Sequence, residues 1–277
     1  MYDFVGFFER FGYYTILMKI STPYIPREYL ALKINYCKKG LAKLPEVSLS
    51  TRKIHGEKVT ACIFESHVYK SDSKNGAELF QTAKKRMSLI SELTKLEGIW
   101  YSQFNCPVPE DYQPHKVVRQ INTGYNGLVN INKQYFDSLK NDANPNHRDK
   151  KFHVFNGICY RSNIERNIAA YYTEQGIPFK YEPEVWIAGL NKPIYPDFVA
   201  FYRELDLCKF HEHFGLMDKT SYLREAEIKY NDYSNAGLVP GLDILFTYDI
   251  SGMPFDIRSL GPAINLSIYN SMLLPYE

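Results

Sequence analysis

A chain of 277 residues with a formal net charge of +2 has room for one large domain or two modest ones, and it is not a polycation, so nucleic-acid binding must come from local basic patches. Hydrophobic residues are 45% and charged residues 23%, an ordinary composition for a soluble globular protein, whereas aromatic residues are high at 15%. The five cysteines show no CxxC spacing, which argues against a disulfide framework and favours a reducing cytoplasm, and no apolar run reaches the roughly 20 residues that cross a bilayer.

The N-terminal half predicts an α+β region. Residues 1–20 have no clear pattern and lack the basic start and clean apolar core of a signal peptide. Apolar residues near helical spacing predict a helix over residues 27–44. Two alternating runs around a His-Gly pair predict a β-hairpin over residues 47–65, with basic residues near its tip.

A second helix is predicted over residues 75–99, and it carries the basic triplet Lys84, Lys85 and Arg86. The triplet is either a solvated face or a contact for phosphates, and its three residues are candidates for nucleic-acid binding. Residues 140–151 are rich in Asn, Pro and charge, which is typical of a surface loop or linker. We therefore expect an N-terminal α+β region over residues 1–150 and a second domain over residues 151–277.

The pattern becomes more regular after residue 151. Residues 161–176 predict a helix, with Ser162 as the N-cap, Glu165 at the capping-box spacing and Gly176 as the C-terminal stop. The chain then predicts three strands, a helix and a final strand, over residues 177–188, 194–202, 208–215, 218–237 and 241–251.

Two acids, Asp197 and Glu212, lie within apolar runs of this region. Carboxylates in apolar strands are costly unless a cation compensates them. Mg²⁺ prefers oxygen ligands, and two acids on neighbouring strands would hold it rigidly. Glu165 on a helix could orient metal-bound water, and Lys229 could position the attacking water and stabilise developing negative charge.

The stretches "RSNIERNIAAYYTEQGIPFKYEPEV", "YPDF" and "HEHFG" resemble the PD-(D/E)XK nuclease superfamily, and most closely its branch with Glu-His-Phe-Gly or Glu-His-Leu-Gly in the second strand. The resemblance covers about residues 155–250. It implies an α/β fold with a restriction-endonuclease-like αβββαβ core, in which helices flank a mixed central sheet. It also implies Mg²⁺ or Mn²⁺ as cofactor and hydrolysis of DNA phosphodiester bonds.

Matched position by position, the resemblance gives Glu165, Asp197 and Glu212 the roles of the family's acids. Asp197, Glu212 and the backbone carbonyl of His213 would bind the metal. Arg161 and Ser162, from the same helix motif as Glu165, are assigned to nucleic-acid contact.

The sequence departs from the family where a lysine usually follows the second acid by two residues, because Phe214 occupies that position. In the resembling branch a lysine from the following helix is thought to substitute, and Lys229 is the candidate. Tyr222, Lys229 and Tyr233 share one helical face, as that branch's pattern shows. Lys209 is the rival, but its odd offset from the second acid should direct it to the opposite side of the strand.

Two distances express these expectations. The Asp197 and Glu212 carboxylates should approach within about 5 Å of one another, close enough to share an ion. The Lys229 ammonium should lie within about 6 Å of either carboxylate.

The leading hypothesis is a cytoplasmic, Mg²⁺-dependent deoxyribonuclease that cuts DNA internally, in phage defence or a mobile element. It would bind DNA and no membrane, as a homodimer or with a partner protein of a multi-component system. One alternative is a catalytically inactive nuclease-fold module that binds nucleic acid or a partner protein. Another is a structural protein whose acids form salt bridges with Arg161 or Lys180.

Individual residues also have simpler interpretations. Glu165 could be only a capping-box residue, His213 a satisfied strand histidine, and Lys229 a solvated helix lysine.

Overall fold

The computed structural model describes residues 25–54, 57–70, 73–110, 117–146, 148, 151–215, 217 and 219–273. The chain is mixed α/β, as predicted, and forms two compact units. The first unit is residues 27–113, and the second comprises residues 1–26 and 114–277. None of the described helices is long and apolar enough to cross a membrane.

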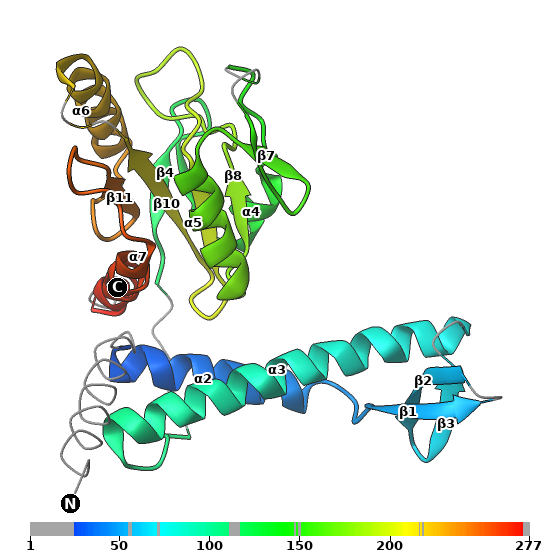
Figure 1. Cartoon of the computed structure of the whole chain (residues 1–277). Helices are drawn as coiled ribbons and strands as arrows, with labels where there is room; N and C mark the ends of the chain where they lie inside the picture. Colours follow the sequence, from blue (N-terminus) through cyan, green and yellow to red (C-terminus); the bar gives the residue numbers. More distant parts are fainter. Residues whose placement is uncertain are drawn as a thin grey trace, which may run out of the picture. The chain divides into compact units, whose positions relative to one another are not determined.

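The first unit pairs two helices and carries a small antiparallel sheet at one end of the pair (Figure 1). Its elements are α2 (Arg27–Ala42), β1 (Ser48–Ile54), β2 (Glu57–Phe64), β3 (His67–Lys70) and α3 (Lys74–Phe104). The predicted helices and hairpin are confirmed, while the hairpin's His-Gly pair lies outside the described residues. The third strand was not predicted: Glu65 and Ser66, both with positive φ, form a two-residue turn without the usual Asn-Gly signal.

The basic triplet of α3 does not act as one surface. The Arg86 guanidinium donates to the carbonyl of Leu41 (3.2 Å) in the last turn of α2 and to that of Leu44 (2.8 Å) just after it, so it ties α3 to the end of α2. The Lys84 ammonium lies 4.6 Å from the Phe80 ring centroid. Arg86 therefore has a structural role that its sequence context did not indicate.

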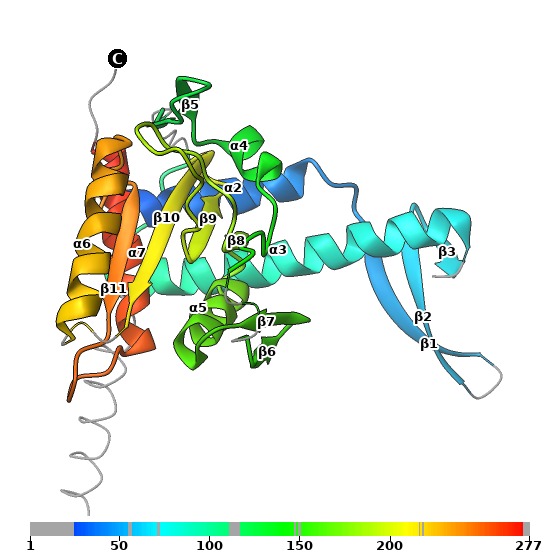
Figure 2. The same ribbon diagram turned by 90° about the horizontal axis from the view of Figure 1, so that it is seen from above.

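The second unit is built on a four-stranded sheet of order β11-β10-β9-β8, whose strands lie side by side in Figure 2. Strands β8, β9 and β10 are antiparallel, and β11 is parallel to β10. The elements run α5 (Asn163–Glu174), β8 (Phe179–Tyr181), β9 (Phe198–Tyr202), β10 (Leu207–Phe214), α6 (Thr220–Asn235), β11 (Ile244–Tyr248), η2 (Ile257–Ser259) and α7 (Leu260–Met272). The predicted order of helix, three strands, helix and strand is confirmed, and Asp197 lies just before β9 rather than within it.

Helices cover both faces of this sheet. Alternate residues of β10 point to opposite faces and contact the helices on each. On one side His211 and Lys209 bond to Tyr172 of α5 and Ser271 of α7. On the other side Glu212 bonds to Tyr233 of α6. The same side receives α4 (Lys133–Ser138), whose Tyr135 packs on Phe210.

Helix α5 forms as its local sequence predicts. The Ser162 hydroxyl accepts a hydrogen bond from the backbone N–H of Glu165 (3.0 Å), which makes it the N-cap. Ile168, Ala169 and Tyr172 are buried and attach the helix to the sheet.

The boundary between the units lies between residues 113 and 114, not near residue 150 as predicted. The Arg119 guanidinium donates twice to buried Asp243, at 2.8 and 2.6 Å. The backbone N–H of Cys208 in β10 donates to the carbonyl of Ile131 (2.7 Å). The Asn- and Pro-rich composition suggested a linker, but the segment belongs to the second unit and contains β4 (Gln120–Asn122), β5 (Leu128–Asn130) and α4.

The predicted linker over residues 140–151 is also tied to the sheet. The backbone N–H groups of Asp142 and Ala143 donate to the carbonyls of Tyr181 and Glu182, at 2.6 and 3.0 Å. A short hairpin follows, formed by β6 (His153–Phe155) and β7 (Ile158–Tyr160), and leads directly into α5.

Candidate functional site

Asp197 and Glu212 lie opposite each other across β9 and β10. Phe198 pairs with His211 in the antiparallel register, so the next position pairs Asp197 with Glu212. Directly opposite residues of an antiparallel pair point to the same face, with Cβ atoms about 5 Å apart. The backbone N–H of Asp197 donates to Glu212 Oε2 (3.1 Å), and that of His213 donates to Asp197 Oδ2 (2.8 Å). The register therefore supports the predicted proximity of the two acids.

The Glu212 carboxylate is fully buried and lies against α6. Its Oε1 forms an ion pair with the Lys229 ammonium, and its Oε2 accepts a hydrogen bond from the Tyr233 hydroxyl (2.9 Å). The Tyr222 hydroxyl accepts a hydrogen bond from the N–H of Gly215 (3.1 Å). The tyrosine–lysine–tyrosine face of α6 thus contacts the end of β10, and the predicted distance for Lys229 is confirmed.

Phe214, at the position where the family usually has lysine, is buried in an aromatic stack with Phe246 and Tyr248. Lys209 points away from the acids, as predicted: its ammonium bonds to the Ser267 carbonyl (3.1 Å) and the Ser271 hydroxyl (2.7 Å) of α7. Of these two lysines, Lys229 and not Lys209 accompanies the acids.

Asp197 pairs with Arg161 from the segment before α5. Arg161 Nη2 lies 3.0 Å from Asp197 Oδ1, while Arg161 Nε lies 2.8 Å from Glu182 Oε1. Arg161 was predicted to contact nucleic acid, but in this structure its guanidinium is held among carboxylates.

Glu165 is buried beside Arg161. Its Oε2 accepts hydrogen bonds from the Tyr181 hydroxyl (2.6 Å) and the backbone N–H of Arg161 (3.1 Å). A capping box would direct this side chain to the N–H of Ser162. Glu165 thus contributes a carboxylate to the cluster, while Ser162 is occupied as the N-cap.

Glu182 is a member of the site that sequence reasoning did not identify. It is fully buried, with φ of 40°, and its carboxylate meets Arg161, Lys151 and Asn144. Lys151 also pairs with Asp142. The available signal was a glutamate placed before proline at the end of a strand, but its partners are 20 to 40 residues away in sequence.

The ion pairs of this cluster join five carboxylates to three cations. The carboxylates are Asp142, Glu165, Glu182, Asp197 and Glu212, and the cations are Lys151, Arg161 and Lys229. With all five acids ionised, the cluster carries a net charge of −2. Four of the five carboxylates are buried and Asp142 is partly exposed, and an excess of negative charge of this kind is one that a divalent cation would neutralise.

Burial and neighbouring charges shift the proton affinities of these groups. Burial and then the neighbouring charge of Asp197 raise the pKa of Glu165 to about 7, against the opposing charge of Arg161. Burial also raises the pKa of Glu212, against the opposing charge of Lys229. Burial lowers the pKa of Lys229, but Glu212 and then Asp197 raise it more strongly, so the ammonium stays charged.

The histidines of β10 are bound within the protein. His211 Nε2 and His213 Nδ1 lie 3.0 and 2.9 Å from the same hydroxyl oxygen, that of Thr247. Burial lowers the pKa of both imidazoles, that of His211 to about 3. Thr247 thus occupies Nδ1 of His213, while its buried Nε2 has no hydrogen-bond partner among the described residues and lies 3.5 Å from Asp249 Oδ2. The backbone carbonyl of His213 stays the predicted ligand.

The oxygen atoms of the two acids suit a hard divalent cation such as Mg²⁺. A carboxylate offers about four lone-pair sites. Among the described residues, Asp197 accepts one hydrogen bond at each oxygen and Glu212 Oε1 meets only Lys229, so each acid retains acceptor capacity. Among the described residues, no three His, Cys, Asp or Glu side chains are grouped as metal ligands; two carboxylates and a carbonyl would be the donor set.

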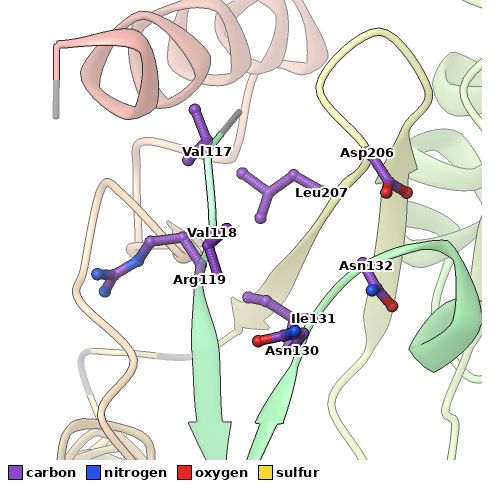
Figure 3. Close-up of a pocket in the computed structure, with 8 residues that line it drawn as sticks. All are labelled: Val117, Val118, Arg119, Asn130, Ile131, Asn132, Asp206 and Leu207. Atoms are coloured by element: carbon purple, nitrogen blue, oxygen red, sulfur yellow. The ribbon is translucent and has the colours of Figure 1, made fainter. Parts of the chain in front are cut away.

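A separate pocket lies beside β4 and β5 (Figure 3). It is lined by Val117, Val118, Arg119, Asn130, Ile131, Asn132, Asp206 and Leu207. None of the predicted catalytic or metal-binding residues lines it.

The chain matches no protein-family model, no curated protein and no solved structure.

Proposed function

We propose that this protein is a divalent-metal-dependent endonuclease that hydrolyses DNA phosphodiester bonds, with the restriction-endonuclease-like core that its motifs resemble. The observation that carries the proposal is the Lys229 ammonium, which reaches from α6 to the buried Glu212 opposite Asp197. This is the lysine that the departure at Phe214 requires. The helix–three strands–helix–strand order gives further support.

In this proposal Asp197, Glu212 and the carbonyl of His213 hold Mg²⁺ or Mn²⁺. When bound, the ion would act as a Lewis acid and lower the pKa of a water molecule. Lys229 orients the attacking water and offsets charge developing on the phosphate. Glu165, hydrogen-bonded to Tyr181, orients water from the α5 side.

A second candidate is a catalytically inactive module of the same fold that binds nucleic acid or a partner protein. Phe214 at the usual lysine position supports this module. A further observation favours both it and the structural protein with internal salt bridges: Arg161 and Lys229 already compensate Asp197 and Glu212. Buried ion pairs of this kind occur in sites with no catalytic role. Titration of metal into the protein separates the two candidates, because an inactive module closed by its own cations gains no stability from Mg²⁺.

The test is cleavage of supercoiled plasmid DNA in Mg²⁺, Mn²⁺ and EDTA by the wild-type protein and Asp197→Ala. We expect nicked and linear products with the wild type only when metal is present, and none with Asp197→Ala. Asp137→Ala is the matched control, because Asp137 forms an exposed ion pair with Lys133 in the same unit. Metal-dependent cleavage retained by Asp197→Ala would reject the proposed centre.

A further inference from the structure

Residues 182–197 connect β8 to β9 and run out and back as two arms that one isolated β-bridge joins; this segment is called the ribbon below. The backbone N–H of Glu182 donates to the carbonyl of Asp197 (3.0 Å). Val185 and Ile194 exchange backbone hydrogen bonds of 2.9 and 2.8 Å. Extended chain rises about 3.3 Å per residue, so the residues beside this bridge lie about 13 Å along the ribbon from the candidate acid.

Trp186 stands on the exposed side of this ribbon. Val185 and Ile187 are each 1% exposed, whereas Trp186, between them, is 46% exposed. Its indole N–H donates to Glu184 Oε1 (2.9 Å). Because this bond satisfies the only polar atom of the ring, what the side chain presents to solvent is an apolar aromatic surface in a fixed orientation.

The turn between β4 and β5 packs against the same ribbon and adds a second aromatic residue. Ala188 N donates to the Asn122 carbonyl (2.8 Å). At Gly124, with φ of +71°, a Cβ atom would lie 3.2 Å from the Ala188 Cα, so the close approach requires glycine. The next residue, Tyr125, is 99% exposed. Exposed Lys192 in the ribbon supplies positive charge for a phosphate backbone.

We propose that Trp186, assisted by Tyr125, is a stacking platform for an unpaired DNA base, so that the substrate contains a single-stranded segment near the cleavage site. This inference rests on the proposed function. A base offers its face to an aromatic side chain only when it is unpaired or at a strand end. At 3.4 Å per stacked nucleotide, the ribbon distance places that base about four nucleotides from the scissile phosphate.

Tryptophan fluorescence provides a direct test, because the chain contains only two tryptophans, Trp186 and Trp100. Trp100 is fully buried, and its indole N–H is bonded to the Cys106 carbonyl (2.6 Å). A change in tryptophan emission caused by base stacking therefore reports Trp186. The full chain in EDTA is titrated with a single strand of about 20 nucleotides, longer than the roughly 16-nucleotide footprint of a single-strand-binding fold. The same sequence as a blunt duplex is the comparison.

We expect the single strand to quench the emission and to bind more tightly than the duplex. Trp186→Leu should bind the single strand about 5- to 150-fold more weakly, as the loss of one stacked base predicts, and leave duplex affinity unchanged. Trp186→Phe should restore most of the affinity. Phe152→Leu is the control, since Phe152 is an aromatic residue of the same unit and is 74% exposed.

The proposed stacking platform is wrong if tryptophan emission stays unchanged at a saturating concentration of single-stranded DNA. It is also wrong if Trp186→Leu weakens single-strand and duplex binding equally. The proposed nuclease activity is judged separately by cleavage in Mg²⁺ with Asp197→Ala. Quenching without cleavage would support the platform and reject the nuclease, and cleavage without quenching would do the reverse.

Discussion

Replacing Lys229 by methionine removes the cation that faces the buried carboxylate of Glu212. The Glu212 side chain is 0% exposed and that of Lys229 is 46% exposed. In the variant, Oε2 keeps its hydrogen bonds from Tyr233 and from the N–H of Asp197, but Oε1 loses its ionic partner. We expect a loss of stability whose size depends on pH.

The magnitude follows from burial. Breaking a fully buried ion pair costs about 3–5 kcal/mol. Lys229 is nearly half exposed, so water reaching Oε1 in the variant reduces the loss to about 1–3 kcal/mol. The loss cannot exceed the free energy needed to protonate Glu212, because the protonated side chain needs no cation. With an unfolded pKa of about 4.3, protonation costs about 3.7 kcal/mol at pH 7 and about 1 kcal/mol at pH 5.

The sign of the pH dependence is set by Glu212. Burial raises its folded pKa above the unfolded value, so the stability it contributes is present at low pH and is lost as the pH rises through the folded pKa. Removing Lys229 raises that pKa further. The variant should therefore be destabilised more at pH 8 than at pH 5.

The assay is urea unfolding of wild type and Lys229→Met in EDTA at both pH values. Lys140→Met is the control, because Lys140 is an exposed lysine of the same unit. An equal loss at pH 5 and pH 8, or no loss at either, would refute the coupling between Lys229 and Glu212.

The pKa of Glu165 is raised to about 7 in the folded protein, so the melting temperature of the metal-free protein should fall as the pH rises from 5 to 8. Glu165→Gln should reduce this fall, whereas the control Glu174→Gln, at an exposed position, should leave it unchanged. Glu165→Gln should also slow cleavage less than Asp197→Asn, measured as the initial rate of plasmid nicking, because it acts through water. Arg119→Met should cost about 3–5 kcal/mol in urea unfolding, since it leaves the buried Asp243 carboxylate unpaired; a loss below about 1 kcal/mol would show that Asp243 does not depend on this pair. Mg²⁺ should raise the melting temperature of the wild type and not that of Asp197→Ala, whereas equal shifts would place the metal elsewhere.

Local signals in the sequence predicted much of the second unit. The Ser162 N-cap and the glycine stop defined α5, and alternation in the apolar runs defined β10. The position of Lys229 followed from the spacing of Tyr222 and Tyr233 on one face of α6, together with the resemblance. These features depend on residues close together in the chain, which is why they could be read before the structure.

Long-range contacts could not be predicted in the same way. Glu182 contacts Lys151 and Asn144, which are more than 30 residues away in sequence and come close to it only in the folded chain. Arg86 looked like part of a basic surface until its contacts with the end of α2 were seen. The segment after residue 114 has the composition of a linker, but the partner that binds it, Asp243, lies more than 100 residues later.

The most direct test of the acid–lysine centre is the single-turnover rate of DNA cleavage in Mg²⁺ by wild type and Lys229→Met, with DNA affinity measured in parallel. Loss of one donor that acts in the transition state lowers turnover by about 100-fold or more. We predict that decrease with DNA affinity largely unchanged. Cleavage by Lys229→Met at the wild-type rate would contradict the proposed role of Lys229.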